Sequence, residues 1–175
     1  MRKIPWILGF AAILMSVVAS AQTYPNKAIR LIVPFAAGSL TDSLGRLLAK
    51  ELTAVLGQPV IVDNKPGASA IIGAQATAQA APDGYVLLLT TNTPQAANPS
   101  LFKKLPYDPV KSFTPIARIG YYPFVLVVNP AVGATSVKEL IDFARARPGK
   151  LSYATASSMS FVSAETFNVL AETDL

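Results

Sequence analysis

The sequence contains no cysteine and no histidine, and these two absences exclude several kinds of site. Without histidine there is no Ser-His-Asp or Cys-His nucleophilic site, and without cysteine there is no disulfide framework and no zinc finger. Charge is also scarce, because only 14% of the 175 residues are charged whereas 51% are hydrophobic. A chain of this length and composition can bury the core of one domain or of two small ones.

Positive charge is in modest excess, with 15 Lys and Arg against 10 Asp and Glu. Two of the basic residues, Arg2 and Lys3, lie in an N-terminal segment that we expect to be removed, which leaves 13 against 10. This small surplus is spread along the chain, so we predict no nucleic-acid partner. We also predict no metal and no cofactor, because the sequence has neither a cluster of metal ligands nor a glycine-rich nucleotide motif.

The first 21 residues have the pattern of a secretory signal peptide. Arg2 and Lys3 precede an uncharged and mostly apolar run over residues 4–18, and Ala19-Ser20-Ala21 offers the small residues that a signal peptidase accepts. The run is shorter than the ~20 residues that a membrane-spanning helix needs. We therefore expect cleavage after Ala21 and export of the mature chain to the periplasm, with an uncleaved membrane anchor as the alternative.

Strands and helices alternate in the remaining sequence. Short apolar runs at 29–33, 60–62 and 85–90 predict buried strands, and a helical period predicts helices over 42–56 and 71–80. Strands that are apolar on both faces are typical of a parallel sheet covered by helices on both sides. Three βα units in succession therefore predict an α/β fold.

A second group of elements follows a proline-rich crossing segment, residues 92–115, in which we expect one short helix. The predicted elements are strands at 116–119, 124–128 and 151–154, a helix opening at Ser136 and a final helix over 161–171. We place the boundary between a first lobe, 22–120, and a second lobe, 121–175, near the break at 120–124. Three aromatic residues there, Tyr121, Tyr122 and Phe124, are expected to pack between the lobes, or else to line a crevice.

Small, hydroxyl-rich loops follow three of the predicted strands, at 35–42, 90–93 and 155–160. In an open α/β sheet the carboxyl ends of the strands are where ligands bind, and the unpaired N–H groups of a helix start can hold a carboxylate or phosphate. The plainer interpretation is that Ser and Thr before a helix only cap it. Asp42 also has two interpretations: it can stabilise the first helical turn, or it can accept a hydrogen bond from a ligand.

Residues 33–42, Val-Pro-Phe-Ala-Ala-Gly-Ser-Leu-Thr-Asp, resemble the V-P-F-x-x-G-G-x-x-D segment of the periplasmic solute receptors of tripartite tricarboxylate transporters, the Bug-type family. Further similar motifs lie at 57–68, 81–85, 98–101, 104–109, 137–140 and 148–151. The resemblance implies a type II periplasmic-binding-protein-like fold, in which two α/β lobes close on a small organic carboxylate. It also implies a monomer without enzymatic activity that meets membrane transporter subunits transiently.

The same resemblance implies which residues contact the ligand. In the first lobe they are Phe35, Ala36, Gly38, Ser39, Thr41, Asp42, Thr90, Thr91 and Asn92. In the second lobe they are Thr155, Ala156, Ser157 and Ser158. These loops contain no Arg or Lys, so recognition would depend on backbone dipoles, hydroxyl groups and water.

The chain departs from the family pattern in two ways. Ser39 stands where the family has its second glycine, so we expect less conformational freedom in that loop. Family members are also considerably longer, so we expect a truncated receptor with a nearly complete first lobe and a partial second lobe. Such a chain would expose apolar surface in the second lobe and bind its ligand weakly.

A small exported α/β hydrolase is the alternative function. One of the loop serines would then need a base, and without histidine only a lysine such as Lys65 or Lys103 could serve, in a Ser-Lys arrangement. No G-x-S-x-G motif is present. The sequence therefore favours a receptor.

Overall fold

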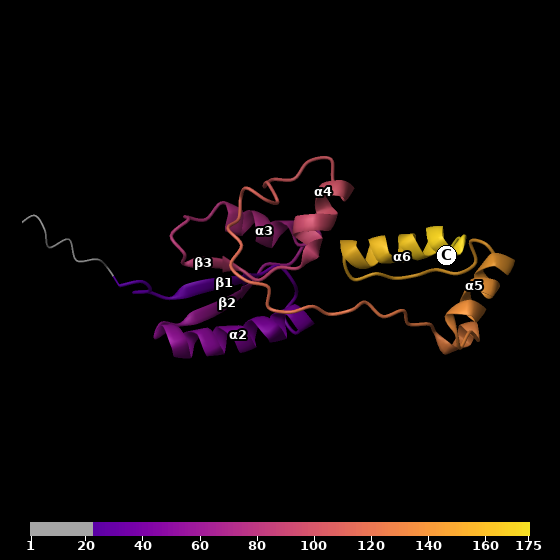
Figure 1. The fold of residues 1–175 in the computed structure, drawn as a ribbon, viewed down its shortest axis with the longest axis horizontal. Coiled ribbons are helices and arrows are strands. Elements are labelled where there is room, and N and C mark those ends of the chain that lie inside the picture. The colour runs from indigo at the N-terminus through magenta and orange to yellow at the C-terminus, as the bar shows by residue number, and fades with distance from the viewer. Residues whose placement is uncertain (1–22) are drawn as a thin grey trace, which may run out of the picture.

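A computed structural model describes residues 23–175 (Figure 1). The predicted signal peptide and its cleavage site lie outside the described residues. The elements in chain order are β1 (Ile29–Val33), α2 (Leu40–Leu56), β2 (Val60–Asn64), α3 (Ile71–Ala78), β3 (Val86–Leu88), the π-helical turn η2 (Thr93–Ala97), α4 (Asn98–Leu101), the 3-10 turn η3 (Pro130–Val132), α5 (Val137–Ala146) and α6 (Ser158–Ala171). Within residues 23–175, no helix has the length and apolarity needed to cross a bilayer.

The three strands form one parallel sheet in the order β2-β1-β3. Ile29 pairs with Val60 on one side of β1, and Arg30 pairs with Val86 on the other. Helix α2 covers one face of this sheet and α3 the other (Figure 1). The predicted α/β fold with a covered parallel sheet is therefore confirmed.

The core lies beneath the central strand β1. Ile29, Leu31 and Val33 are buried together with Ala49 of α2. Because side chains alternate along a strand, the equally buried Ile32 faces the opposite side. Helix α2 approaches closely, since a Cβ added at Gly45 would lie 3.0 Å from Cγ2 of Val33.

Helix α3 packs just as closely on the other face, at the residue that follows β1. A Cβ added at Gly73 would lie 2.6 Å from Cβ of Pro34 and 3.0 Å from the carbonyl oxygen of Lys65. Only glycine fits this contact. The contact fixes the place where the chain leaves the sheet and enters the loop at 35–39.

An extended segment, residues 113–129, leads away from the sheet to η3, α5 and α6 (Figure 1). The start of α6 lies against η2, and the C-terminus lies at the other end of this helix. Arg145 of α5 donates from Nε and Nη2 to the carbonyl oxygen of Ala171, at 2.9 and 2.7 Å. These bonds connect α5 to the last turn of α6.

The strands predicted at 116–119, 124–128 and 151–154 are wrong, because none of these segments joins a β-ladder. A strand exists only where a neighbour supplies hydrogen bonds, and no neighbouring strand lies beside them in the described part of the chain. Packing of the three aromatic residues between lobes is also wrong. Tyr121 is 90% exposed, while Tyr122 and Phe124 contact each other edge-on and are each about half exposed.

Candidate functional site

The carboxyl ends of the three parallel strands lie at one edge of the sheet, and two of the predicted loops begin there. One loop follows β1 at residue 35, and the other follows β3 at residue 90. The start of α6 faces the same edge, since it lies against η2 directly after the second loop (Figure 1). The structure therefore brings the start of α6, which follows the predicted second-lobe loop, close to η2, which follows the loop at 90–92.

The loop after β1 is a tight turn followed by a capped helix. The Ser39 N–H donates to the carbonyl oxygen of Ala36 at 3.1 Å, and Gly38 has a φ of +82°, as the third residue of a type II turn requires. Ser39 itself has a φ of −68°, which a serine adopts without strain, so its difference from the family's glycine does not distort the turn. Its hydroxyl oxygen accepts from the backbone N–H of Asp42 at 3.2 Å, which confirms the predicted cap of α2.

Asp42 is 2% exposed, and its carboxylate is fully engaged inside the protein. Oδ2 accepts from the Gly38 N–H at 2.8 Å and from Nε of Arg46 at 3.0 Å, and Oδ1 accepts from Nδ2 of Asn64 at 2.9 Å. The hydrogen bond from Arg46, followed by those from Gly38 and Asn64, lowers the pKa of Asp42 to about 2. Of its two interpretations, the structure favours local stabilisation over ligand contact.

The other predicted residues of this loop divide into exposed and buried groups. Ala36 and Gly38 are exposed, Phe35 is half-buried, and Thr41 is buried in the first turn of α2. The backbone N–H groups of Leu40 and Thr41 belong to that first turn, where no helical carbonyl can accept from them. The loop therefore presents backbone donors at the edge of the sheet.

The loop after β3 uses its hydroxyl groups to organise the turn that follows. Thr90 donates from Oγ1 to Oε1 of Gln95 at 2.7 Å, and Oγ1 of Thr91 accepts from the Thr93 N–H at 3.3 Å. Asn92 is exposed and immediately precedes η2. Gln95 escaped the sequence analysis, since a glutamine in a proline-rich segment has no distinguishing pattern.

The second-lobe loop is shorter than predicted, because α6 begins at Ser158. Ser157 is the cap: its Oγ accepts from the Ser160 N–H at 3.2 Å, and Oγ of Ser160 accepts from the Ser157 N–H at 3.0 Å. Ser158 is buried, whereas Thr155 and Ala156 are exposed. Two capped helix starts, those of α2 and α6, therefore belong to the candidate site.

Arg46 and Asn64 are polar residues that the sequence analysis missed. Asn64 is the last residue of β2 and pairs in register with Val33, the last residue of β1. The strand-end rule that located the other loops could therefore have found it. Arg46 carried no comparable signal, because an arginine on the polar face of a helix is common.

The lysines that a Ser-Lys hydrolase would need are placed differently. Nζ of Lys65 lies 3.7 Å from Oδ2 of Asp63, in an ion pair, and Lys103 is exposed. Among residues 23–175, no hydrogen bond joins either lysine to a loop serine.

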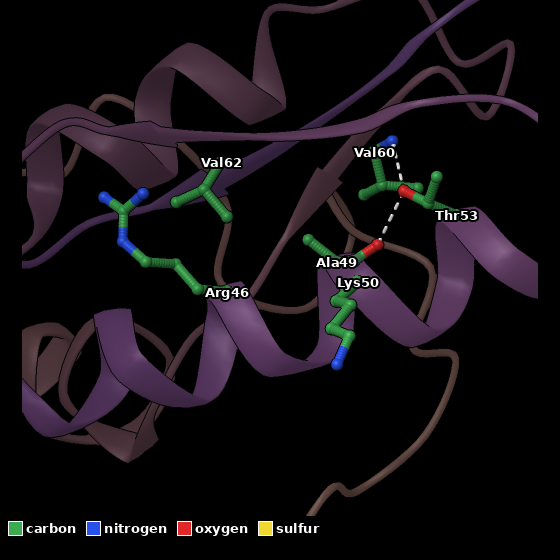
Figure 2. A pocket seen from close by; sticks show the side chains of 6 residues that line it. All are labelled: Arg46, Ala49, Lys50, Thr53, Val60 and Val62. Carbon is green, nitrogen blue, oxygen red and sulfur yellow. Dashed lines mark hydrogen bonds between the residues drawn. The ribbon is translucent and has the colours of Figure 1, made fainter.

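Figure 2 shows a shallow hollow between α2 and β2, lined by Arg46, Ala49, Lys50, Thr53, Val60 and Val62. Thr53 closes one end of it, since its Oγ1 donates to the carbonyl oxygen of Ala49 at 2.7 Å and accepts from the Val60 N–H at 2.9 Å. The hollow lies along the β2 side of the sheet and contains none of the predicted site residues. It adds nothing to the candidate site.

Comparison with known proteins matches residues 44–173 to the family described as tripartite tricarboxylate transporter family receptor. BugT of Bordetella pertussis is 44% identical over 136 residues, which are 77% of this chain and 42% of BugT. A Cupriavidus necator protein of the UPF0065 group is 41% identical over 159 residues, 87% of this chain and 46% of that protein. The chain thus spans less than half the length of these relatives.

Solved structures give the same result. The Rhodopseudomonas palustris protein Rpa4515, solved with adipate, has a TM-score of 0.83 at 34% identity, over 87% of this chain and 52% of that one. MatC from the same organism, solved with bound malate, has a TM-score of 0.76 at 33% identity, over 86% of this chain and 52% of that one. These likenesses confirm the predicted type II periplasmic-binding-protein-like fold class. The match covers about half of each solved chain.

Proposed function

Because this chain belongs to the family of tripartite tricarboxylate transporter receptors, we propose that it is an exported receptor that captures a small organic carboxylate and delivers it to membrane transporter subunits. The family is one of solute-binding receptors and not of enzymes. The proposal includes a monomer in the periplasm that catalyses no reaction. It also includes a division of the chain into a first lobe, 22–120, and the part of a second lobe at 121–175.

One observation supports the site most directly: two capped helix starts from different parts of the chain face the same edge of the sheet. Helix starts carry partial positive charge and unpaired N–H groups that can donate to a carboxylate, so each can bind one. The loops around them contain no charged donor, and Thr and Ser hydroxyls supply further hydrogen bonds. A diacid could therefore engage both regions at once.

The proposed ligand contacts are Phe35, Ala36, Gly38, Ser39, Thr41, Thr90, Thr91, Asn92, Thr155, Ala156, Ser157 and Ser158. Asp42 belongs to the same site as a supporting residue. Adipate and malate, present in the structures of two similar proteins, are the first acids to test. A ligand held by both regions would favour a closed arrangement over an open one, which gives a membrane partner a state to recognise.

The test is a thermal-shift screen of the purified protein against organic acids, with dimethyl adipate as a neutral control for adipate. A bound acid at a hundredfold excess over its Kd stabilises the folded state by about 2.7 kcal/mol. We expect one acid to raise the melting temperature while the ester does not. Absence of a shift with every acid, or an equal shift with the ester, would contradict the proposal.

The same preparation separates the receptor from the hydrolase. We expect no turnover of p-nitrophenyl esters by the protein, with or without a stabilising acid. Turnover that is lost in Ser39→Ala would reverse the assignment, because that result identifies a serine nucleophile.

A further inference from the structure

We infer that Asp42, Arg46 and Asn64 form a positioning network that fixes the loop at 35–38, and that none of the three contacts the ligand. The network supports a binding site only if the proposed function holds. The geometry that it imposes on the loop is independent of any ligand.

Both ends of the loop are held by this network. At its start, Nδ2 of Asn64 donates to the carbonyl oxygen of Phe35 at 3.1 Å, and at its end the Gly38 N–H donates to Oδ2 of Asp42 at 2.8 Å. The same Nδ2 of Asn64 donates to Oδ1 of Asp42 at 2.9 Å, which joins the two ends. The turn is thereby anchored to α2 and to β2 at once.

Arg46 balances the negative charge that this arrangement places at the start of α2. Its Nε donates to Oδ2 of Asp42 at 3.0 Å, and its Nη2 donates to Oδ1 of Asn64 at 3.1 Å. Without the guanidinium, a buried carboxylate beside the helix start would repel an anionic ligand. With it, the partial positive charge of the helix start remains available.

The network also determines which groups the loop can offer. Both carboxylate oxygens of Asp42 are occupied and the Asp42 side chain is 3% exposed, so this residue has little surface for a ligand. The Phe35 carbonyl oxygen, an acceptor that would repel a carboxylate, is bonded to Asn64. Donors remain at the edge: the N–H groups of Leu40 and Thr41 and the hydroxyl of Ser39.

The first test needs no ligand, because hydrogen exchange of the Gly38 amide can be followed by NMR in the free protein. We expect slow exchange in the wild type, and exchange at least about tenfold faster in Asn64→Ala and in Asp42→Ala, because each variant removes the side chain that holds one end of the loop. The matched control is Asp63→Asn: Asp63 precedes Asn64 on β2, and its carboxylate is bonded to Arg30 of β1 and not to the loop. The Leu89 amide, bonded to the carbonyl oxygen of Ile32, reports whether each variant is folded.

Unchanged Gly38 exchange in both folded variants would overturn the inference, as would equal acceleration in Asp63→Asn. If the Leu89 amide exchanges rapidly in Asn64→Ala, that variant is not folded. Arg46→Gln, which changes a half-exposed side chain, is then used in its place. We expect that variant to accelerate Gly38 exchange at least about threefold, and no acceleration would count against the network.

The second test measures adipate and malate binding by calorimetry. For the acid that binds, we expect Asn64→Ala to raise Kd at least about tenfold, because the donors of the loop are no longer pre-organised, and Asp63→Asn to change Kd by less than about twofold. Equal losses in the two variants would show that the network has no specific effect on the site. If the wild type binds no organic acid, the proposed function fails, while the exchange result still decides whether the network positions the loop.

Discussion

The sheet lobe, residues 23–112, and the C-terminal region, residues 113–175, contain similar strand-forming runs that reach different structures. In the sheet lobe, β1 lies between two parallel strands and is covered by a helix on each face, and its four apolar side chains are almost completely buried. In the C-terminal region the apolar run at 124–128 has the same β-branched character, yet Val127 is 83% exposed. The difference shows that β propensity describes how well a segment suits a sheet, but the segment forms a strand only where a neighbouring strand pairs with it.

The largest effect should come from shortening a leucine in each region. Leu31→Ala leaves a cavity in the sheet lobe and should lower the free energy of unfolding by about 2–5 kcal/mol. Leu126→Ala, at a half-exposed position, should change it by less than about 0.5 kcal/mol. Urea unfolding followed by far-UV circular dichroism measures both. A similar loss in the two variants would mean that the extended segment is as well packed as β1.

A smaller effect is expected from adding one methyl group to a glycine in each region. Gly73→Ala forces a Cβ against Pro34 and should cost about 1–3 kcal/mol of stability. A Cβ added at Gly120 meets no atom within 4 Å, so the melting temperature of Gly120→Ala should equal that of the wild type or exceed it slightly. A neutral Gly73→Ala would show that α3 does not approach Pro34 as closely as described.

The smallest effect concerns one carboxylate in each region and the amide that donates to it. The pKa of Asp42 is about 2 when folded, below its ordinary 3.8, so its ionisation stabilises the folded loop above about pH 4 and this contribution is lost as the pH falls through 2. The Gly38 amide shift should therefore titrate with a midpoint near 2. In the C-terminal region, the Thr135 N–H and hydroxyl lower the pKa of Glu139, and the Thr135 amide shift should titrate below the ordinary 4.5.

These shifts can be followed in one series of NMR spectra over acidic pH. A Gly38 midpoint at 3.8 or above would contradict the hydrogen bond to Asp42. The matched variant is Asp42→Asn, in which the Gly38 titration should vanish while that of Thr135 remains.

Local patterns predicted the sheet lobe well because its structural signals lie close together in the sequence. Ser39 caps α2, Gly57 ends it in a left-handed conformation, and the successive βα units give a parallel sheet with β1 between β2 and β3. In the C-terminal region the cap at Ser136 was equally readable, since a cap depends on a residue three positions away, whereas the cap at Ser157 was missed and α6 begins three residues before its predicted start at 161. Strands could not be inferred there, because apolar character indicates a preference for burial and not the presence of a partner.

The candidate site was predictable to the level of its loops and no further. The strand-end rule located 35–42 and 90–92, and the small polar residues at 155–160 marked the region where α6 starts, although the helix begins at Ser158 and not at 161. The role of Asp42 depends on Asn64, which is 22 residues away in the sequence. No local pattern reveals such a contact, so the carboxylate could be interpreted as a cap or a ligand contact until the two strands were seen in register.

The exposed run from Phe124 to Val128 has a consequence for the protein in concentrated solution. It contains five successive apolar residues with no charge, and three of the five are valines. Short uncharged stretches of high β propensity are those that stack between molecules into cross-β fibrils, and charged residues within them prevent such stacking. We therefore expect concentrated samples to be prone to such stacking, and expect a lysine at the exposed positions Val125 or Val127 to reduce it.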